Sequence, residues 1–113
     1  MIRKSDDFTP RANARGGRGT IEMHTLLTPE ECAGKVTLCN RIVLPPQSSI
    51  GYHAHTQDVE YYIILKGAGI FTGEDGKAVE AVEGDVCLIK KGESHGLENN
   101  SDQPLEILAI MVE

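Results

Sequence analysis

Short stretches of alternating apolar and polar residues run through most of this chain and are separated by turn residues. Alternation with a period of two is typical of β-strands that are buried on one face. A further strand must follow the turn 90–94 and carry His95. The other predicted strands cover residues 21–27, 36–44, 50–55, 59–65, 70–72, 78–82, 86–90 and 105–112. Many short strands with regular turns indicate a closed or double-sheet all-β architecture.

Two local signals fall between these strands. Thr28, Pro29 and Glu31 form a helix start, with a threonine cap, a proline at the first helical position and a glutamate three residues after the cap. Gly34 follows so closely that one helical turn at most is expected. An Asp-Gly pair at Gly76 predicts a tight hairpin between strands 70–72 and 78–82. No repeat, linker or second domain is visible.

Composition is consistent with one modest domain. The chain has 113 residues, 40% of them hydrophobic, which is enough to fill one core. No apolar run approaches the roughly 20 residues that span a bilayer, and residues 1–7 lack the apolar stretch of a signal peptide. Cys32, Cys39 and Cys87 have no C-x-x-C spacing and cannot all pair within the chain, so reduced thiols in the cytoplasm are predicted.

Charge is distributed unevenly along the chain. Residues 1–19 carry five basic and two acidic side chains, a net charge of +3, whereas residues 20–113 carry six basic and fifteen acidic ones, a net charge of −9. The Gly/Arg-rich stretch 11–19 has no aromatic residues for base stacking, and the acidic body would repel phosphates, so nucleic-acid binding is not expected. We predict instead an N-terminal arm (residues 1–19) whose arginines meet carboxylates of the domain (residues 20–113) or of a partner subunit.

Four residues have the chemistry and spacing of a metal site. His53 and His55 are one residue apart on a predicted strand, so their side chains emerge on the same face about 7 Å apart. Glu60 lies at the start of the next strand, and His95 comes from a distant one. Three imidazole nitrogens and one carboxylate oxygen suit a divalent transition metal with open positions for a ligand. The fourth histidine, His24, has no such neighbours and is expected to be structural.

These residues and the surrounding glycines resemble the two signature motifs of the cupin family. The first motif is a glycine, five residues, His-x-His, three or four residues, Glu, six residues and a glycine. The second is a glycine, five residues, Pro, one residue, Gly, two residues, His, three residues and Asn. Eight of the ten fixed positions are present; Gln47 replaces the first glycine and Lys90 replaces the proline. The motifs span residues 47–99, with 16 residues between Gly67 and Gly84, as in small microbial cupins.

The resemblance implies a jelly-roll barrel, the double-stranded β-helix, that holds one divalent metal ion (Mn, Fe, Co, Ni, Cu or Zn) per chain. It implies His53, His55, Glu60 and His95 as the ligands. Homodimers are common in this family, and the apolar face of strand 59–65 that carries Tyr61, Ile63 and Leu65 would suit a second subunit. Tyr62 shares the face of Glu60 and is the one candidate proton donor, although a purely structural place in the core or rim suits it equally well.

Three functions remain compatible with this pattern. The favoured one is a metal-dependent enzyme (an isomerase, decarboxylase, lyase or dioxygenase) that acts on a small carboxylate, sugar or other oxygen-bearing molecule by Lewis-acid or dioxygen chemistry. The alternative is a non-catalytic module that binds or senses a small sugar or carboxylate. A storage role is disfavoured by the intact ligand set. No serine, cysteine or lysine has the spacing of a covalent nucleophile, and Cys87 is expected in the core.

Overall fold

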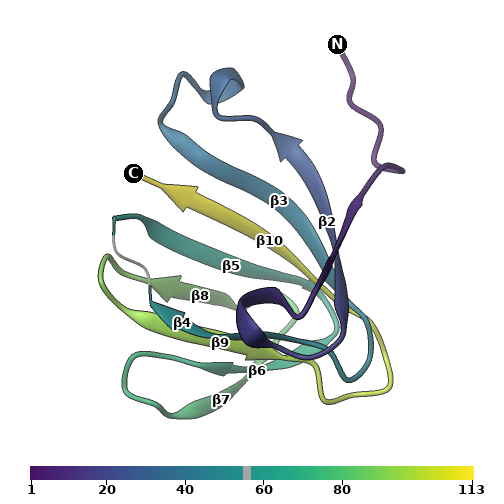
Figure 1. Ribbon diagram of the computed structural model, residues 1–113, viewed down its shortest axis with the longest axis vertical. Coiled ribbons are helices and arrows are strands. Elements are labelled where there is room, and N and C mark those ends of the chain that lie inside the picture. The colour runs from purple at the N-terminus through teal and green to yellow at the C-terminus, as the bar shows by residue number, and fades with distance from the viewer. Residues whose placement is uncertain (55–56) are drawn as a thin grey trace.

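The fold is an all-β sandwich closed into a barrel, seen in a computed structural model that describes residues 1–54 and 57–113 (Figure 1). Within these residues, two short 3₁₀ turns accompany ten strands in two antiparallel sheets. The elements are β1 (Thr9–Ala12), η1 (Ala14–Gly16), β2 (Thr20–Leu27), η2 (Glu30–Cys32), β3 (Val36–Leu44), β4 (Ser49–Ala54), β5 (Val59–Lys66), β6 (Ala68–Thr72), β7 (Ala78–Val82), β8 (Val86–Ile89), β9 (Ser94–Glu98) and β10 (Leu105–Val112). The predicted jelly-roll architecture is confirmed.

The order of strands in the sheets brings distant parts of the chain side by side. The larger sheet has the order β1-β2-β3-β10-β5-β8, so the last strand lies between β3 and β5 (Figure 1). The smaller sheet has the order β4-β9-β6-β7. Consequently, the two strands that carry His53 and His95 are neighbours in one sheet, while the strand that carries Glu60 lies in the other.

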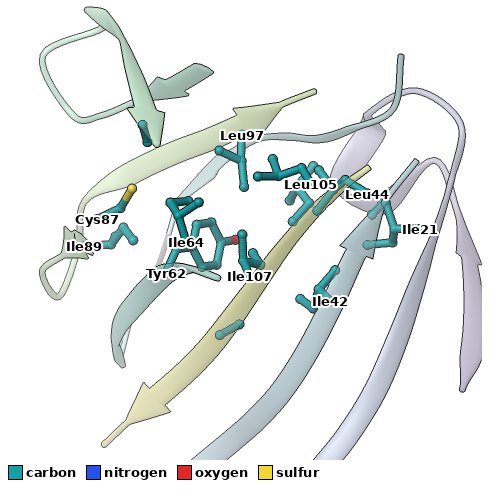
Figure 2. Close-up of a cluster of buried hydrophobic side chains, with 14 residues drawn as sticks. Ile21, Ile42, Leu44, Tyr62, Ile64, Cys87, Ile89, Leu97, Leu105 and Ile107 are labelled. Carbon is teal, nitrogen blue, oxygen red and sulfur yellow. The ribbon is translucent and has the colours of Figure 1, made fainter. Parts of the chain in front are cut away.

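The core fills the space between the sheets, and β10 shows how alternation builds it. Leu105, Ile107 and Ala109 of this strand are fully buried, whereas Leu108 and Ile110, the residues on either side of Ala109, face outward and are partly exposed. Each fully buried aliphatic side chain contributes about 1.5–3 kcal/mol relative to exposure. Figure 2 shows the buried side chains of both sheets as one continuous cluster, with Tyr62 inside it.

Most strand predictions agree with the structure to within a residue or two at the ends. The end of the predicted strand 50–55 reaches residue 55, which lies outside the described residues. The single helical turn is present as η2, where Thr28 N–H donates to Glu31 Oε1 at 2.8 Å and Ala33 and Gly34 end the turn with positive φ. Gly76 closes the predicted hairpin with a φ of +75°. Of the helices in the described parts of the chain, none is long and apolar enough to cross a membrane.

The N-terminal arm holds the two elements that the sequence did not predict. β1 pairs antiparallel with β2, from Thr9 opposite Met23 to Ala12 opposite Thr20. η1 then turns the chain back across the opening of the barrel and contacts β4 of the other sheet (Figure 1). The arm therefore lies on its own chain and joins the two sheets at one end.

Candidate metal centre and its cavity

Two histidines face each other across neighbouring strands of the smaller sheet. His53 of β4 is the register partner of His95 of β9, and their ring centroids are 4.5 Å apart. Glu60 comes from the opposite sheet, at the start of β5. One ligand atom from each of these three residues lies within 4.8 Å of the others. The antiparallel register thus brings together groups that are 42 positions apart in the chain.

Burial makes this group unusual for a cluster of ionisable side chains. His95 is fully buried and Glu60 is only 5% exposed. Removing a carboxylate from water is costly unless it gains a charged or hydrogen-bonding partner. Here Oε1 of Glu60 lies 3.1 Å from Nε2 of His95. The two groups satisfy each other, and both aim their donor atoms at the same point between the sheets.

The ring of His53 is oriented by its own strand. Its Nδ1 lies 2.7 Å from the carbonyl oxygen of Gly51, which accepts a hydrogen bond only if Nδ1 carries the proton. Nε2 is then left with its lone pair. A backbone carbonyl on the far nitrogen is the usual way of fixing the tautomer and orientation of a metal-binding histidine.

The donor set fits a divalent transition metal. Metal–nitrogen and metal–oxygen bonds of about 2.0–2.2 Å place neighbouring ligand atoms about 3 Å apart, which agrees with the 3.1 Å between Glu60 and His95. Imidazole and carboxylate are the ligands that Mn, Fe, Co, Ni, Cu and Zn accept. The structure brings together three of the four predicted ligands, His53, Glu60 and His95. The fourth, His55, lies outside the described residues.

Tyr62 lines the same cavity as His53 and Glu60. Its side chain is 2% exposed, and its ring centroid is 5.1 Å from that of His95. Burial raises the pKa of Tyr62 well above 10, and the negative charge of Glu60 raises the pKa further. The phenol is therefore protonated at neutral pH. A neutral hydroxyl group beside the donor atoms supplies a hydrogen-bond donor to whatever occupies the cavity.

The cavity itself has a volume of about 60 Å³. One water requires about 10–15 Å³ by the same measure, so this space accommodates a molecule of a few heavy atoms. Its lining includes both apolar and polar residues. The apolar lining consists of Ala14, Ile21, Met23, Leu38, Ile42, Ile50 and Met111. The polar lining consists of His53, Glu60, Tyr62, Arg11 and Arg15.

Comparison with known proteins identifies the family of this chain. A family profile described as the cupin domain matches residues 40–111, which is more than half of the chain. The chain belongs to the cupin family. A protein of Thermotoga maritima named oxalate-binding protein is 43% identical, over 99% of this chain and 93% of the relative.

Solved structures agree with the assignment. A crystal structure of a predicted oxalate decarboxylase from Thermotoga maritima matches with a TM-score of 0.92 and 43% identity, over 99% of this chain and 98% of that one. A polyketide cyclase from Streptomyces resistomycificus shares the fold, with a TM-score of 0.79 and 20% identity over 99% of this chain and 80% of that one.

The two departures from the cupin motifs have visible compensations. Gln47, in place of a glycine, has a φ of +64°, and its Nε2 donates to the carbonyl oxygens of Asn100 and Ser101, both at 3.1 Å. Lys90, in place of a proline, donates its backbone N–H to Oε1 of Glu93 at 2.7 Å. A proline has no N–H to donate. Both turns are therefore held by hydrogen bonds that a glycine side chain at 47 or a proline at 90 could not make.

The arm of this cupin meets the domain in two different ways. Arg3 pairs with Glu31 at 2.8 Å and Arg18 approaches Glu98 at 3.8 Å, as the sequence predicted for arginines of the arm. Arg11 and Arg15 instead line the cavity, a position that sequence reasoning missed. Neither arginine belongs to the cupin motifs. The only signal was the Gly16-Gly17 pair that follows Arg15, which permits a close backbone approach.

His24 lies away from this cavity, as expected of a structural histidine. Its side chain is buried on β2, with Nδ1 3.2 Å from the carbonyl oxygen of Ser5 and its ring tilted against that of Phe8, with the ring centroids 5.3 Å apart. It holds the start of the arm against the larger sheet. Cys87 is likewise buried in the core, and burial raises the pKa of its thiol to about 11.

Proposed function

We propose that this cupin binds a small dicarboxylate, of which oxalate is the simplest, at a divalent metal ion held by His53, His55, Glu60 and His95. The observation that carries the proposal is the convergence of buried imidazole and carboxylate donors at a cavity of about 60 Å³. The size of the cavity favours a two- or three-carbon ligand over a sugar. The oxalate-binding relative, which is 43% identical over nearly the whole chain, supports the same ligand class.

Each protein group has a distinct role in this proposal. His53 is oriented by the carbonyl oxygen of Gly51, and Glu60 neutralises part of the charge of the ion. When bound, a divalent ion supplies Lewis acidity, which polarises a carboxylate oxygen and stabilises developing negative charge. The apolar residues of the lining limit access of water to the ligand and thereby strengthen these electrostatic interactions.

Metal binding is tested by elemental analysis of protein purified without a chelating tag. We expect about one equivalent of Mn, Fe, Co, Ni, Cu or Zn per chain, and its loss in Glu60→Gln. The matched control is Glu80→Gln, an exposed glutamate of β7. Wild-type protein without stoichiometric metal after anaerobic reconstitution would refute the metal site. Calorimetric titration of the loaded protein with oxalate, at a fixed salt concentration, tests the ligand.

Catalysis is the second part of the proposal. Tyr62 is a protonated phenol in the cavity, so it is placed to donate a proton to an atom of the ligand that gains negative charge. We propose a decarboxylase in which the bond between the two carboxyl carbons of oxalate breaks and carbon dioxide leaves; the retained carbon keeps the electron pair and takes the proton of Tyr62, which gives formate, and solvent reprotonates the phenol. The alternative, favoured by the name of the oxalate-binding relative, is binding without turnover.

Product analysis separates these two functions. Loaded protein incubated with oxalate should yield formate and carbon dioxide, and Tyr62→Phe should abolish formate while leaving metal content and oxalate affinity within about twofold of wild type. The control Tyr52→Phe changes an exposed tyrosine whose hydroxyl donates to the carbonyl oxygen of Gly73. Tight oxalate binding with no formate, aerobically or anaerobically, would establish the non-catalytic module.

We also propose that the protein is a homodimer formed through the outer face of the larger sheet. On this face Leu88 lies beside Tyr61, and Val86 beside Ile63. Leu88 is 63% exposed and Val86 49%. Continuous exposed apolar surface on a sheet is typical of a subunit interface. Leu88→Glu should yield monomers in sedimentation equilibrium, whereas Val79→Glu, on the smaller sheet, should not.

The cytoplasm remains the proposed location of the protein. Cys32, Cys39 and Cys87 are all free thiols in the structure. Free cysteines persist in a reducing compartment. Thiol titration of protein extracted under acid trapping should give three reduced cysteines per chain.

A further inference from the structure

The two arginines that line the cavity come from a segment that the cupin motifs do not include. Arg11 is on β1 and Arg15 is in η1, and both border the cavity together with Glu60 and Tyr62. The arm thus contributes two cationic residues to the lining of the cavity.

Backbone contacts hold the arm in this place. Ser49 N–H donates to the carbonyl oxygen of Arg18, and Arg18 N–H donates to the hydroxyl of Ser49, both at 2.9 Å. A Cβ atom on Gly17 would lie 2.3 Å from the carbonyl oxygen of Ser49, and one on Gly51 would lie 2.1 Å from that of Arg15. Glycine is required at both positions for the chains to approach so closely. The contact lies two residues before His53 on the same strand.

The backbone of the arm is also strained where it carries the arginine. Asn13 has a φ of +51° and Arg15 a φ of +53°, the left-handed region that costs a non-glycine residue roughly 1–2 kcal/mol. The side chain of Asn13 offsets part of this cost by donating to the carbonyl oxygen of Gly17 at 3.1 Å. Strain that is retained by the surrounding contacts often marks a residue with a function.

Within the described residues, these two arginines differ from the other arginines in having no carboxylate beside them. Arg3, Arg18 and Arg41 each pair with a glutamate. Among residues 1–54 and 57–113, no carboxylate lies within ion-pair distance of Arg11 or Arg15. The domain has a net charge of −9, so carboxylates are abundant elsewhere on its surface. Two guanidinium groups without a carboxylate partner therefore remain available to an anionic ligand.

We propose that Arg15, assisted by Arg11, binds the carboxylate oxygens of the ligand that face away from the metal site, and so selects dicarboxylates over monocarboxylates. This inference rests on the proposed function. A guanidinium group matches a carboxylate with two parallel hydrogen bonds, which neither an ammonium nor an amide reproduces. A monocarboxylate lacks the second anionic group and gains little from the arm.

The test is calorimetric titration of manganese-loaded protein with oxalate and with acetate. Arg15→Gln should weaken oxalate binding by about tenfold to a hundredfold, the range for a lost charge-assisted hydrogen-bond pair, and acetate binding by less than threefold. Arg15→Lys should lie between wild type and Arg15→Gln, because it keeps the charge without the planar fork. Arg11→Gln should have a smaller effect in the same direction. Arg18→Gln is the control, since Arg18 pairs with Glu98 and Asn100 outside the cavity.

The outcomes separate this inference from the proposed function. Manganese content is measured for every variant, and affinities are compared per loaded site. Equal oxalate affinity of Arg15→Gln and Arg18→Gln would overturn the role of the arm and leave the metal site and its ligand class intact. Equal losses for oxalate and acetate would overturn the selection of dicarboxylates. A loaded wild-type protein that binds no oxalate would remove both proposals.

Discussion

The cavity has two walls of different origin. One wall contains His53 and Glu60, behind which His95 is buried, and the register of the strands that carry the two histidines fixes their positions. The other wall consists of Arg11 and Arg15, which are exposed and belong to an arm that contacts β4 through glycines. The side chains of the first wall are packed against the core. The second depends on a few backbone contacts at the opening of the barrel.

This difference separates stability from ligand choice. We call the first wall the motif wall and the second, with Arg11 and Arg15, the arm wall. Substitutions in the motif wall disturb buried polar groups, so they should lower both the free energy of unfolding and the metal content. Substitutions in the arm wall change the surface charge that faces the ligand. Substitutions in each wall test this separation.

Of these substitutions, Asn99→Ala should lower the free energy of unfolding most. Asn99 is fully buried, and its Nδ2 donates to the carbonyl oxygens of Leu44 at 2.9 Å and Gln103 at 2.8 Å. Its Oδ1 accepts from the N–H and the hydroxyl of Ser101. Several buried partners would be left unsatisfied, so we expect a loss of about 2–4 kcal/mol in the free energy of unfolding by urea. Asn100→Ala, at the exposed neighbour, should change it by less than about 0.5 kcal/mol.

Gly17→Ala should displace the arm. The new Cβ would lie 2.3 Å from the carbonyl oxygen of Ser49, so the backbone has to move, and overpacking of this kind costs about 1–3 kcal/mol. Oxalate affinity should fall with little change in manganese content, because Gly17 belongs to the arm and not to the strand that carries His53. At the control position Gly73, a Cβ would be 3.4 Å from Phe71, and Gly73→Ala should affect neither property. A parallel loss of manganese and oxalate in Gly17→Ala would show that the two walls are not separable.

Variants at Gln47 sharpen the comparison at a motif position. Its φ of +64° favours glycine, while its side chain donates two hydrogen bonds to the turn 100–101. Gln47→Ala loses the hydrogen bonds and keeps the strain, whereas Gln47→Gly loses the hydrogen bonds and relieves the strain. We expect Gln47→Gly to be more stable than Gln47→Ala by about 1 kcal/mol in thermal unfolding. The reverse order would contradict the left-handed backbone at this residue.

The smallest effect is expected at the start of the arm. The guanidinium of Arg3 lowers the pKa of Glu31 to about 2, from an ordinary value near 4.5. The stabilisation from this exposed ion pair is therefore complete above the ordinary pKa and is lost as the pH falls towards 2. A carboxyl resonance of Glu31 that titrates near pH 2 in wild type and at a higher pH in Arg3→Gln would confirm it; the hydrogen bond from Thr28 N–H remains in the variant and keeps part of the shift. Oxalate binding and manganese content should not change.

The sequence predicted the motif wall well because alternation and motif spacing are local signals. Strand parity alone placed Tyr62 on the same face as Glu60, and both line the cavity. The turn signals at Thr28 and Gly76 were also correct, since they depend on residues within a few positions of each other. Pairing of β4 with β9 is not local, and it could be predicted only through the resemblance of both motifs to one family.

The arm wall could not be predicted in the same way. β1 contains Pro10 and is exposed along its whole length, so it shows no apolar alternation. Its position depends on a contact between Gly17 and Gly51, residues that are 34 positions apart with no periodic pattern to connect them. Gly51 is adjacent to the motif histidines, yet its role is to permit this contact, since its own φ is not in the left-handed region.

The contact between the arm and β4 influences which substitutions the sequence of such a protein can accept during evolution. The contact is made by backbone atoms and two glycines, so it does not depend on the side chain at position 11, and at position 15 it requires only a residue that tolerates a positive φ. Drift or engineering at these two sites could replace positive charge by neutral groups without altering the barrel. The same scaffold could thus acquire new ligands by substitutions in a short peripheral segment, while the group formed by His53, Glu60 and His95 is left unchanged.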